Sequence, residues 1–185
     1  TLSDAEFLIE TEGAGSAIAD VAPVRFKTPT SPLQASKIEK RPINIKSIWR
    51  KFHELAYRHE YMLVEGVGGI LAPITEKYLV IDLIREMRLP LIVVCRHTLG
   101  KLNHTLLTLR AAQAEGIEVR GIIFNQTAPK MSAIEKQQPA IVRELTKIPI
   151  LGECHYIKNV SPASFTPKLL AEIEKKLDFD GLRAE

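Results

Sequence analysis

The chain has 185 residues, of which 45% are hydrophobic and 25% are charged, and its formal net charge is +3. This composition is typical of one folded domain and excludes a disordered or collagen-like chain. The charge is small and its Lys and Arg residues are dispersed, so we expect no nucleic-acid partner, and no apolar stretch is long enough to span a membrane. Two cysteines, Cys95 and Cys154, make no disulfide framework, so we expect free thiols in a cytoplasmic protein.

The first third of the chain predicts two helices separated by extended chain. Residues 2–10 form a short helix, because Ser3 and Glu6 have the spacing of a capping box. Residues 24–27 are a possible strand fragment, and residues 28–32 contain two prolines that disfavour helix before them. Residues 44–60 are predicted to be helical because apolar side chains recur at helical spacing, at Ile45, Ile48, Trp49, Phe52, Leu55 and Ala56.

The rest of the chain alternates short apolar runs with helical patterns. The apolar runs show no alternation with polar residues, which is typical of parallel strands buried on both faces; they are 61–66, 89–96, 119–126 and 148–153. Between them lie helical patterns at 79–88, 101–115 and 132–146, and a charged helix and tail follow at 168–185. The pattern predicts an α/β fold, a doubly wound and mostly parallel sheet with helices on both faces, in a single domain of residues 1–185.

Ligands of such sheets bind beyond the carboxyl ends of the strands, which selects four segments of this chain. The first segment is Glu65–Gly69, where a carboxylate precedes three glycines. Backbone N–H groups of glycine-rich turns bind anions, and a carboxylate beside phosphates suits Mg²⁺. The alternative is a turn without a ligand. A dinucleotide fingerprint is not supported, because Leu71 stands where its third glycine belongs.

The other three segments are Arg96–Asn103, Asn125–Thr127 and Gly152–Tyr156. Gly100 and Lys101 precede a long helix, whose free N–H groups form a natural anion site, although a capped helix without a ligand is the alternative. The side-chain amide of Asn125 suits the edge of an adenine, unless this residue only makes a turn. The five histidines show no metal-ligand spacing, so we expect no histidine metal site.

Taken together, these motifs resemble the dethiobiotin synthetase family, whose members have a P-loop and a doubly wound parallel sheet. The resemblance covers about residues 2–157 and is strongest where E-G-x-G-G and L-G-x-x-N-H occur together. The segments that carry it are LSDA, KTPTSPLQAS, YMLVEGVGGILAPI, LPLIVVCRHTLGKLNHTLLTL, GIIFNQTAP and IPILGE.

The resemblance implies ATP-dependent ring closure in biotin synthesis, with Mg²⁺ as cofactor and a homodimer as the functional form. Diaminononanoate takes up CO₂ as a carbamate, ATP phosphorylates the carbamate, and the second amine closes the ring. Asp4 and Glu65 would bind Mg²⁺, and Glu65 and Gly68 would have catalytic roles. The implied nucleotide site consists of Asp4, Glu65, Asn125, Gly152, Glu153, Cys154 and His155. The implied substrate site consists of Ser31, Gly68 and a helix start from the second subunit, Gly100, Lys101, Leu102 and Asn103.

The family's P-loop precedes its Ser-Asp-Ala segment, and residues 1–185 contain no match to the P-loop pattern. We therefore expect little activity from these residues alone and an incomplete sheet. A fragment of a whole enzyme, a second chain that supplies the loop, and a remnant with another role would each explain this. Two other functions stay open: a related cobyrinate-type ATP enzyme, although no glutaminase Cys–His pair is evident, and a non-catalytic regulatory or interaction domain.

Overall fold

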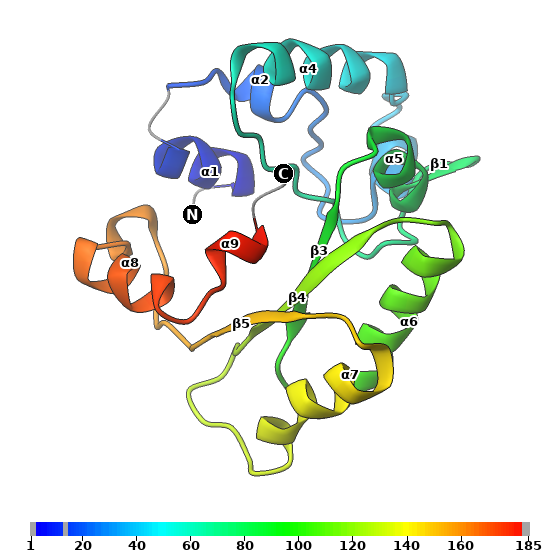
Figure 1. Cartoon of the computed structure of the whole chain (residues 1–185). Coiled ribbons are helices and arrows are strands. Elements are labelled where there is room, and N and C mark those ends of the chain that lie inside the picture. Colours follow the sequence, from blue (N-terminus) through cyan, green and yellow to red (C-terminus); the bar gives the residue numbers. More distant parts are fainter. Residues whose placement is uncertain (1–2, 13–14, 183–185) are drawn as a thin grey trace. The chain divides into compact units, whose positions relative to one another are not determined.

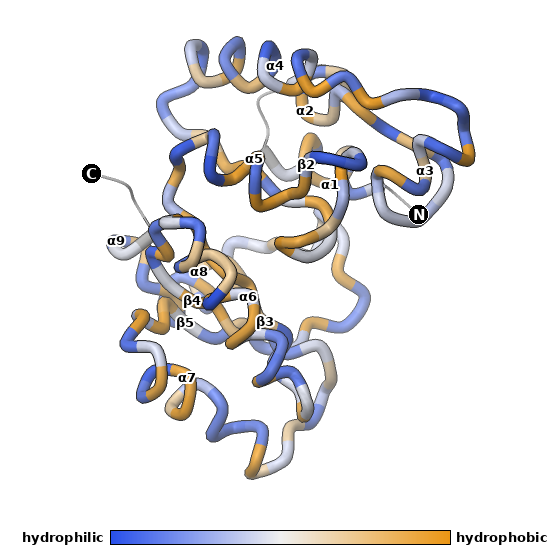
Figure 2. Tube along the Cα trace, turned by 90° about the vertical axis from the view of Figure 1, so that its right-hand side faces the viewer, coloured by the Kyte–Doolittle hydropathy of each residue, from blue (hydrophilic) through white to orange (hydrophobic). Residues whose placement is uncertain are grey.

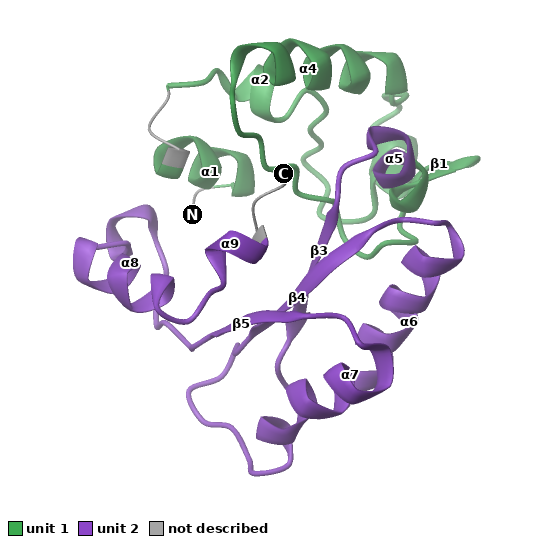
Figure 3. Cartoon of the chain, in the orientation of Figure 1, with its two compact units in different colours: residues 1–82 green, residues 83–185 purple. Residues whose placement is uncertain are grey.

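The computed structural model describes residues 3–12 and 15–182 of the chain. The chain, shown in Figure 1, divides into two compact units, residues 1–82 and residues 83–185, which Figure 3 distinguishes by colour. The boundary falls within helix α5 (Val80–Met87). The single domain expected from the sequence stays a prediction.

The first unit begins with the predicted capped helix. Helix α1 spans Asp4–Glu12, and its capping box is confirmed: the Ser3 backbone N–H donates to the Glu6 carboxylate at 2.7 Å, and the Glu6 N–H donates to the Ser3 hydroxyl at 3.4 Å. A short helix that the sequence did not predict, α2 (Ile18–Val21), packs against α1 and against α4 (Ile45–Arg58). Helix α2 therefore connects α1 with α4.

Helix α4 confirms the predicted helix at 44–60. The Asn44 side chain caps it by accepting a hydrogen bond from the Lys46 N–H at 3.0 Å. Apolar and polar residues alternate along α4 in Figure 2, and its predicted apolar residues are half-buried except Ala56, which is exposed. The Trp49 and Phe52 rings meet edge to face with their centroids 5.5 Å apart. The helix is therefore held by an aromatic stripe on one side.

The remaining elements of the first unit are α3 (Pro32–Ile38), β1 (Pro73–Thr75) and β2 (Tyr78–Leu79). The two strands form a small antiparallel pair, and α3 packs against β1. Neither strand was predicted, because each is only two or three residues long. The possible strand at 24–27 is wrong, since these residues have no strand structure. The buried residues of this unit are Ala35, Ile74, Val80 and Ile81.

The predicted parallel strand at 61–66 is also wrong. These residues have no regular secondary structure, and Leu63 is 95% exposed and Tyr61 71% exposed. A parallel strand is stable only when a neighbouring strand pairs with its backbone and other elements cover its side chains. Within the described residues no strand pairs with this segment, so its apolar side chains stay in contact with solvent.

The second unit contains a parallel sheet of three strands in the order β3-β4-β5: Leu91–Arg96, Val119–Asn125 and Ile150–Cys154. The helices between them are α6 (Leu102–Ala114) and α7 (Gln138–Thr146), the latter preceded by the 3-10 turn η1 (Glu135–Gln137). These elements confirm the predicted strands at 89–96, 119–126 and 148–153 and the predicted helices, including α5. The unit is thus an α/β unit with the expected strand–helix alternation.

Helices lie on both faces of this sheet. On one face a core is formed between the strands and helices α6 and α7; its buried members are Val93, Cys95, Leu109, Ile122, Phe124, Val142 and Ile148. On the other face Leu151 packs between Gly121 of β4 and Gly181 of α9 (Phe179–Leu182), whose contacts with β4 and β5 can be followed in Figure 1. The chain ends with η2 (Pro162–Ser164), α8 (Pro167–Glu174) and α9, which replace the single terminal helix predicted at 168–185.

Burial on both faces holds for β4 but not for β3. Val93 and Cys95 of β3 are buried, whereas Val94 is 62% exposed and Arg96 is exposed. The apolar run of β3 predicted burial of every residue, and this expectation is wrong. On the α6 side the side chains of β3 join the sheet core, whereas on the other face α9 contacts β4 and β5.

Candidate functional site

The carboxyl ends of the three parallel strands meet at one edge of the second unit. Arg96 at the end of β3 lies opposite Asn125 at the end of β4, and Asn125 lies opposite Cys154 at the end of β5. This register brings together three of the segments selected from the sequence, as a parallel sheet requires. Asn125 is exposed, so its amide is open to solvent at this edge.

Hydrogen bonds continue from β4 to the segment after β5. The Gln126 N–H donates to the Cys154 carbonyl at 2.9 Å, which extends the strand pairing by one residue. The Gln126 side-chain oxygen accepts a hydrogen bond from His155 Nδ1 at 3.3 Å, and its amide nitrogen donates to the Ala128 carbonyl at 2.6 Å. Gln126 therefore fixes the orientation of His155, a role that its local sequence pattern does not indicate.

A hollow of about 380 Å³ opens beside the end of β5, and its lining residues are Arg143, Ile150, Gly152, Glu153, His155 and Lys176. Three predicted nucleotide-binding residues are among them: Gly152, Glu153 and His155. Gly152 has φ +151°, and a Cβ atom there would lie 3.0 Å from the Leu177 Cα atom. The glycine therefore lets the segment of Leu177 cross β5 closely, where Gly152 and Leu177 form an antiparallel bridge.

The thiols of this unit are free, as predicted. Cys95 is buried inside the sheet core, and burial raises the pKa of its thiol. Cys154 is half-buried, and burial raises its pKa as well, although the charge of Lys176 acts in the opposite direction. Burial has the larger effect at both positions, so both thiols stay protonated at neutral pH.

Gly100 and Lys101 of the predicted substrate segment end the turn between β3 and α6, and Leu102 and Asn103 are the first residues of α6. Helix α6 begins at Leu102 without a side-chain cap, so its first N–H groups have no side-chain acceptor. Lys101 lies next to this helix start, with its Nζ atom 3.5 Å from His104 Nδ1. An uncapped helix start beside an ammonium group can bind a carboxylate through its backbone donors and its charge.

Glu65 and Gly68 lie in the first unit, in an exposed turn that ends at β1. Gly68 has φ +72°, a conformation that residues with a Cβ atom rarely adopt. The Ala72 N–H donates to the Gly69 carbonyl at 2.8 Å and closes the turn. The glycines thus serve the backbone of the turn, and its N–H groups face solvent rather than a core.

The two predicted Mg²⁺ ligands have the right donor chemistry. Asp4 lies in the first turn of α1 and Glu65 in the exposed turn, both in the first unit, and both carboxylates are exposed. Within the described residues neither carboxylate has a hydrogen-bond or ion-pair partner, so both keep free oxygens for a hard cation. The described residues contain no group of three or more His, Cys, Asp or Glu side chains that could hold a metal ion.

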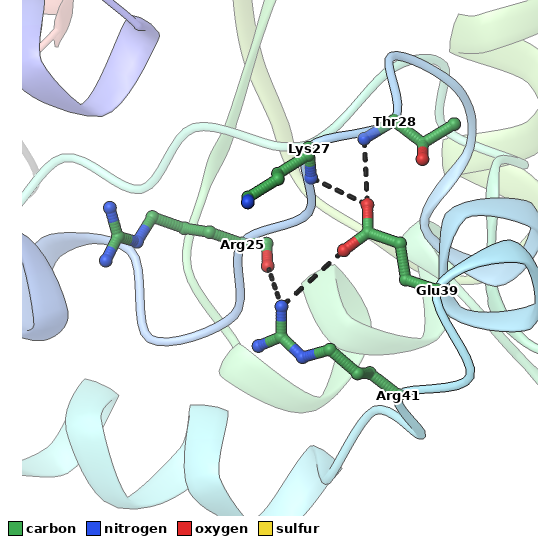
Figure 4. A network of polar contacts seen from close by, with 5 residues as sticks. All are labelled: Arg25, Lys27, Thr28, Glu39 and Arg41. Atoms are coloured by element: carbon green, nitrogen blue, oxygen red, sulfur yellow. Dashed lines mark hydrogen bonds and ion pairs between the residues drawn. The ribbon is translucent and has the colours of Figure 1, made fainter.

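Ser31, the N-cap residue of α3, follows a segment that Glu39 and Arg41 hold in place (Figure 4). The Glu39 carboxylate accepts hydrogen bonds from the backbone N–H groups of Lys27 and Thr28 at 2.7 and 2.8 Å. Arg41 donates to the Arg25 carbonyl at 3.2 Å and pairs with Glu39 at 3.6 Å. The hydrogen bond from Thr28, with that from Lys27 and the charge of Arg41, lowers the pKa of Glu39.

The predicted site residues therefore fall into two groups, one in each unit. The first unit carries Asp4, Ser31, Glu65 and Gly68, and the second carries Gly100, Lys101, Leu102, Asn103, Asn125, Gly152, Glu153, Cys154 and His155. Sequence reasoning missed the side chains that support these residues, because their partners are remote in the chain. They include Glu39, Arg41, His97, Gln126, Glu135 and Gln138.

In the part of the chain that the structure describes, no helix has the length and apolar character needed to cross a membrane. A family model described as an AAA domain matches residues 2–164. The chain is 38% identical over 167 residues to an ATP-dependent dethiobiotin synthetase of Thermodesulfovibrio yellowstonii, which covers 86% of this chain and 70% of the relative.

Two further relatives carry the same name. The enzyme of Bacillus velezensis is 35% identical over 176 residues, covering 95% of this chain and 74% of the relative. The enzyme of Clostridium acetobutylicum is 38% identical over 170 residues, covering 90% of this chain and 70% of the relative. The family model covers every predicted site residue, because all of them lie within residues 2–164. The chain belongs to the family of ATP-dependent dethiobiotin synthetases.

Proposed function

We propose that the protein catalyses ATP-dependent formation of dethiobiotin from 7,8-diaminononanoate and CO₂, with ADP and phosphate as the other products. The observation that carries this proposal is the 35–38% identity to enzymes of that name over 86–95% of the chain. The alignment of Arg96, Asn125 and Cys154 at one sheet edge supports it, because this edge is where such folds bind ligands.

The reaction proceeds in three steps whose atoms balance. One amine of diaminononanoate attacks CO₂ and loses a proton, which gives a carbamate. A carbamate oxygen then attacks the γ-phosphorus of ATP, and ADP leaves with the electrons of the broken P–O bond. The second amine attacks the carbonyl carbon of this mixed anhydride, loses a proton and expels phosphate, which closes the ureido ring of dethiobiotin.

Asp4 and Glu65 are the residues that would hold Mg²⁺ next to the ATP phosphates. Bound Mg²⁺ neutralises negative charge that develops on the transferred phosphoryl group. The free, exposed carboxylates of both residues support this assignment. The backbone N–H groups of the turn around Gly68 would then bind the oxygens of the reacting carbamate, as preorganised donors do elsewhere.

The nucleotide base would bind at the ends of β4 and β5. The exposed Asn125 amide offers one donor and one acceptor to the edge of adenine. The segment Gly152–His155 lies beside it, and Gln126 orients His155. The hollow along Gly152, Glu153 and His155 supports this location, because it gives a ligand a concave surface next to Asn125.

The carboxylate of diaminononanoate would bind at the uncapped start of α6, at Gly100, Lys101, Leu102 and Asn103. In this proposal the helix start comes from the second subunit of a homodimer, and Ser31 contacts the substrate from the segment that Glu39 and Arg41 hold. The homodimer, the cytoplasmic location and the lack of a nucleic-acid partner stay predictions.

An omission assay tests the proposal. The protein is incubated at high concentration with Mg²⁺, ATP, bicarbonate and diaminononanoate, because residues 1–185 contain no P-loop pattern and slow turnover is expected. ADP should form only when both bicarbonate and diaminononanoate are present. ADP formation that needs glutamine and a corrinoid acid would instead indicate the cobyrinate-type alternative. ADP formation that does not depend on diaminononanoate would contradict the proposal.

A further inference from the structure

The turn between β3 and α6 is held by a network of hydrogen bonds that the proposed reaction does not use. The backbone N–H of His97 donates to the Asn125 carbonyl at 2.8 Å, at the edge of the sheet. The Leu99 N–H donates to Glu135 Oε1 at 2.9 Å, and Gln138 Nε2 donates to the Thr98 carbonyl at 2.9 Å. Three consecutive residues before Gly100 are therefore tied to β4, η1 and α7.

His97 is the buried centre of this network. Its side chain is 1% exposed, and its ring lies 5.0 Å from the Phe124 ring, between centroids. His97 Nε2 is 2.8 Å from the Glu135 carbonyl oxygen, which can only accept, so Nε2 carries the hydrogen. Within the described residues Nδ1 has no hydrogen-bond partner, and it lies 3.6 Å from a carboxylate oxygen of Glu153. The ring thus stands between the turn before α6 and the end of β5.

Glu135 uses both of its carboxylate oxygens inside the network. Oε1 accepts from Leu99, while Oε2 accepts from the Ser132 N–H at 2.7 Å and the Ser132 hydroxyl at 2.9 Å. The backbone hydrogen bonds from Ser132 and Leu99 lower the pKa of Glu135. The carboxylate is therefore ionised at neutral pH and has its acceptors occupied, which leaves it a supporting role rather than contact with a ligand.

We propose that Glu135 is a positioning residue for the substrate-carboxylate segment Gly100–Asn103. The inference rests on the proposed function, which places the substrate carboxylate at this segment. A carboxylate bound by backbone donors needs those donors aimed at one point, and misplacement of a binding group by about 1 Å can cost a factor on the order of 100. Glu135 fixes the N–H of Leu99, and with it the direction in which the chain enters Gly100.

The positioning role of Glu135 depends on whether the Leu99 N–H keeps its acceptor. Without the Glu135 carboxylate, the Leu99 N–H loses its acceptor and becomes free to compete for the substrate carboxylate in another geometry. A glutamine at position 135 keeps one acceptor oxygen of similar reach for the Leu99 N–H and places its amide nitrogen near Ser132, whereas an alanine removes both acceptors. Hence the Gln variant should restore binding, and the Ala variant should not.

The test follows the backbone amide signals of Gly100–Asn103 by NMR while 7,8-diaminononanoate is added to the whole chain. The variants are Glu135→Ala, Glu135→Gln and Gln138→Met, and the matched control is Glu144→Ala, which removes an exposed carboxylate of α7. We expect Glu135→Ala to weaken binding about tenfold, a change in Kd that corresponds to about 1.4 kcal/mol. Glu135→Gln and the control should stay within about threefold of the wild type, and Gln138→Met should weaken binding in the same direction.

The outcomes separate the inference from the function on which it rests. If the wild-type amides of Gly100–Asn103 do not shift with diaminononanoate, the proposed substrate site is wrong. If they shift and Glu135→Ala binds as tightly as the wild type, the positioning role is wrong while the site stands. Should Glu135→Ala fail to fold, equal binding by Gln138→Met and the wild type overturns the inference, and loss in Gln138→Met supports it.

Discussion

Substitution of Gly152 by alanine is the sharpest structural test of the site at the end of β5. An added Cβ atom would lie well inside van der Waals distance of the Lys176 carbonyl oxygen and 3.0 Å from the Leu177 Cα atom. Backbone atoms cannot rotate away as a side chain can, so the segment at Leu177 must move. The strained φ of +151° costs about 1–3 kcal/mol, and overpacking costs about 1–3 kcal/mol more. We expect Gly152→Ala to lower the free energy of unfolding by about 2–6 kcal/mol.

Urea unfolding followed by circular dichroism measures this change, and Gly116→Ala is its matched control. Gly116 has φ +67° but open space around its Cβ position, so its substitution carries only the backbone strain of about 1–2 kcal/mol. The difference between the two variants therefore isolates the clash with the segment at Leu177. Equal loss of stability in both variants would refute the close crossing of β5 by that segment.

Three further predictions concern single side chains. Glu65→Gln should lower turnover about 100-fold or more, because it replaces a proposed Mg²⁺ ligand. The melting temperature should not change, because Glu65 is exposed. Unchanged turnover in the ADP assay would contradict the assignment of Glu65 to Mg²⁺. The hydrogen bond from Thr28 lowers the pKa of Glu39. The ionised Glu39 carboxylate therefore stabilises the fold above the ordinary glutamate pKa, and this stabilisation is lost as pH falls through the lowered pKa. Thermal melts against pH should thus show a steeper acidic decline for the wild type than for Glu39→Gln, and parallel curves would contradict this. Iodoacetamide should modify the half-buried Cys154 before the buried Cys95, which peptide mass spectrometry detects; the reverse order would contradict the burial of Cys95.

Local chemistry predicted the second unit well. The apolar runs ending at Arg96, Asn125 and Cys154 became parallel strands, because each run pairs with a neighbour and packs beneath α6 or α7. The capping box of Ser3 and Glu6 formed as predicted, because its two partners are three residues apart. Periodicity and short-range spacing carry enough information for such elements.

Features that depend on remote partners were not predictable. The run around Leu63 has strand composition, yet no described strand pairs with it, and pairing is not encoded in the run itself. Val94 is exposed although it lies in an apolar run, because the elements that cover each face of a strand are set by topology rather than by local sequence. Glu135 reaches Leu99 across 36 positions of the chain, and nothing in either residue's local pattern indicates that bond.

Incorporation of isotope from ¹³C-labelled bicarbonate tests the central claim most directly. The protein is mixed in excess over diaminononanoate with Mg²⁺ and ATP, so that even slow turnover gives product that mass spectrometry can identify. The account predicts dethiobiotin with a single labelled carbon in its ureido ring and one ADP for each molecule formed. ADP release without diaminononanoate, or ADP formation without labelled dethiobiotin, would contradict it.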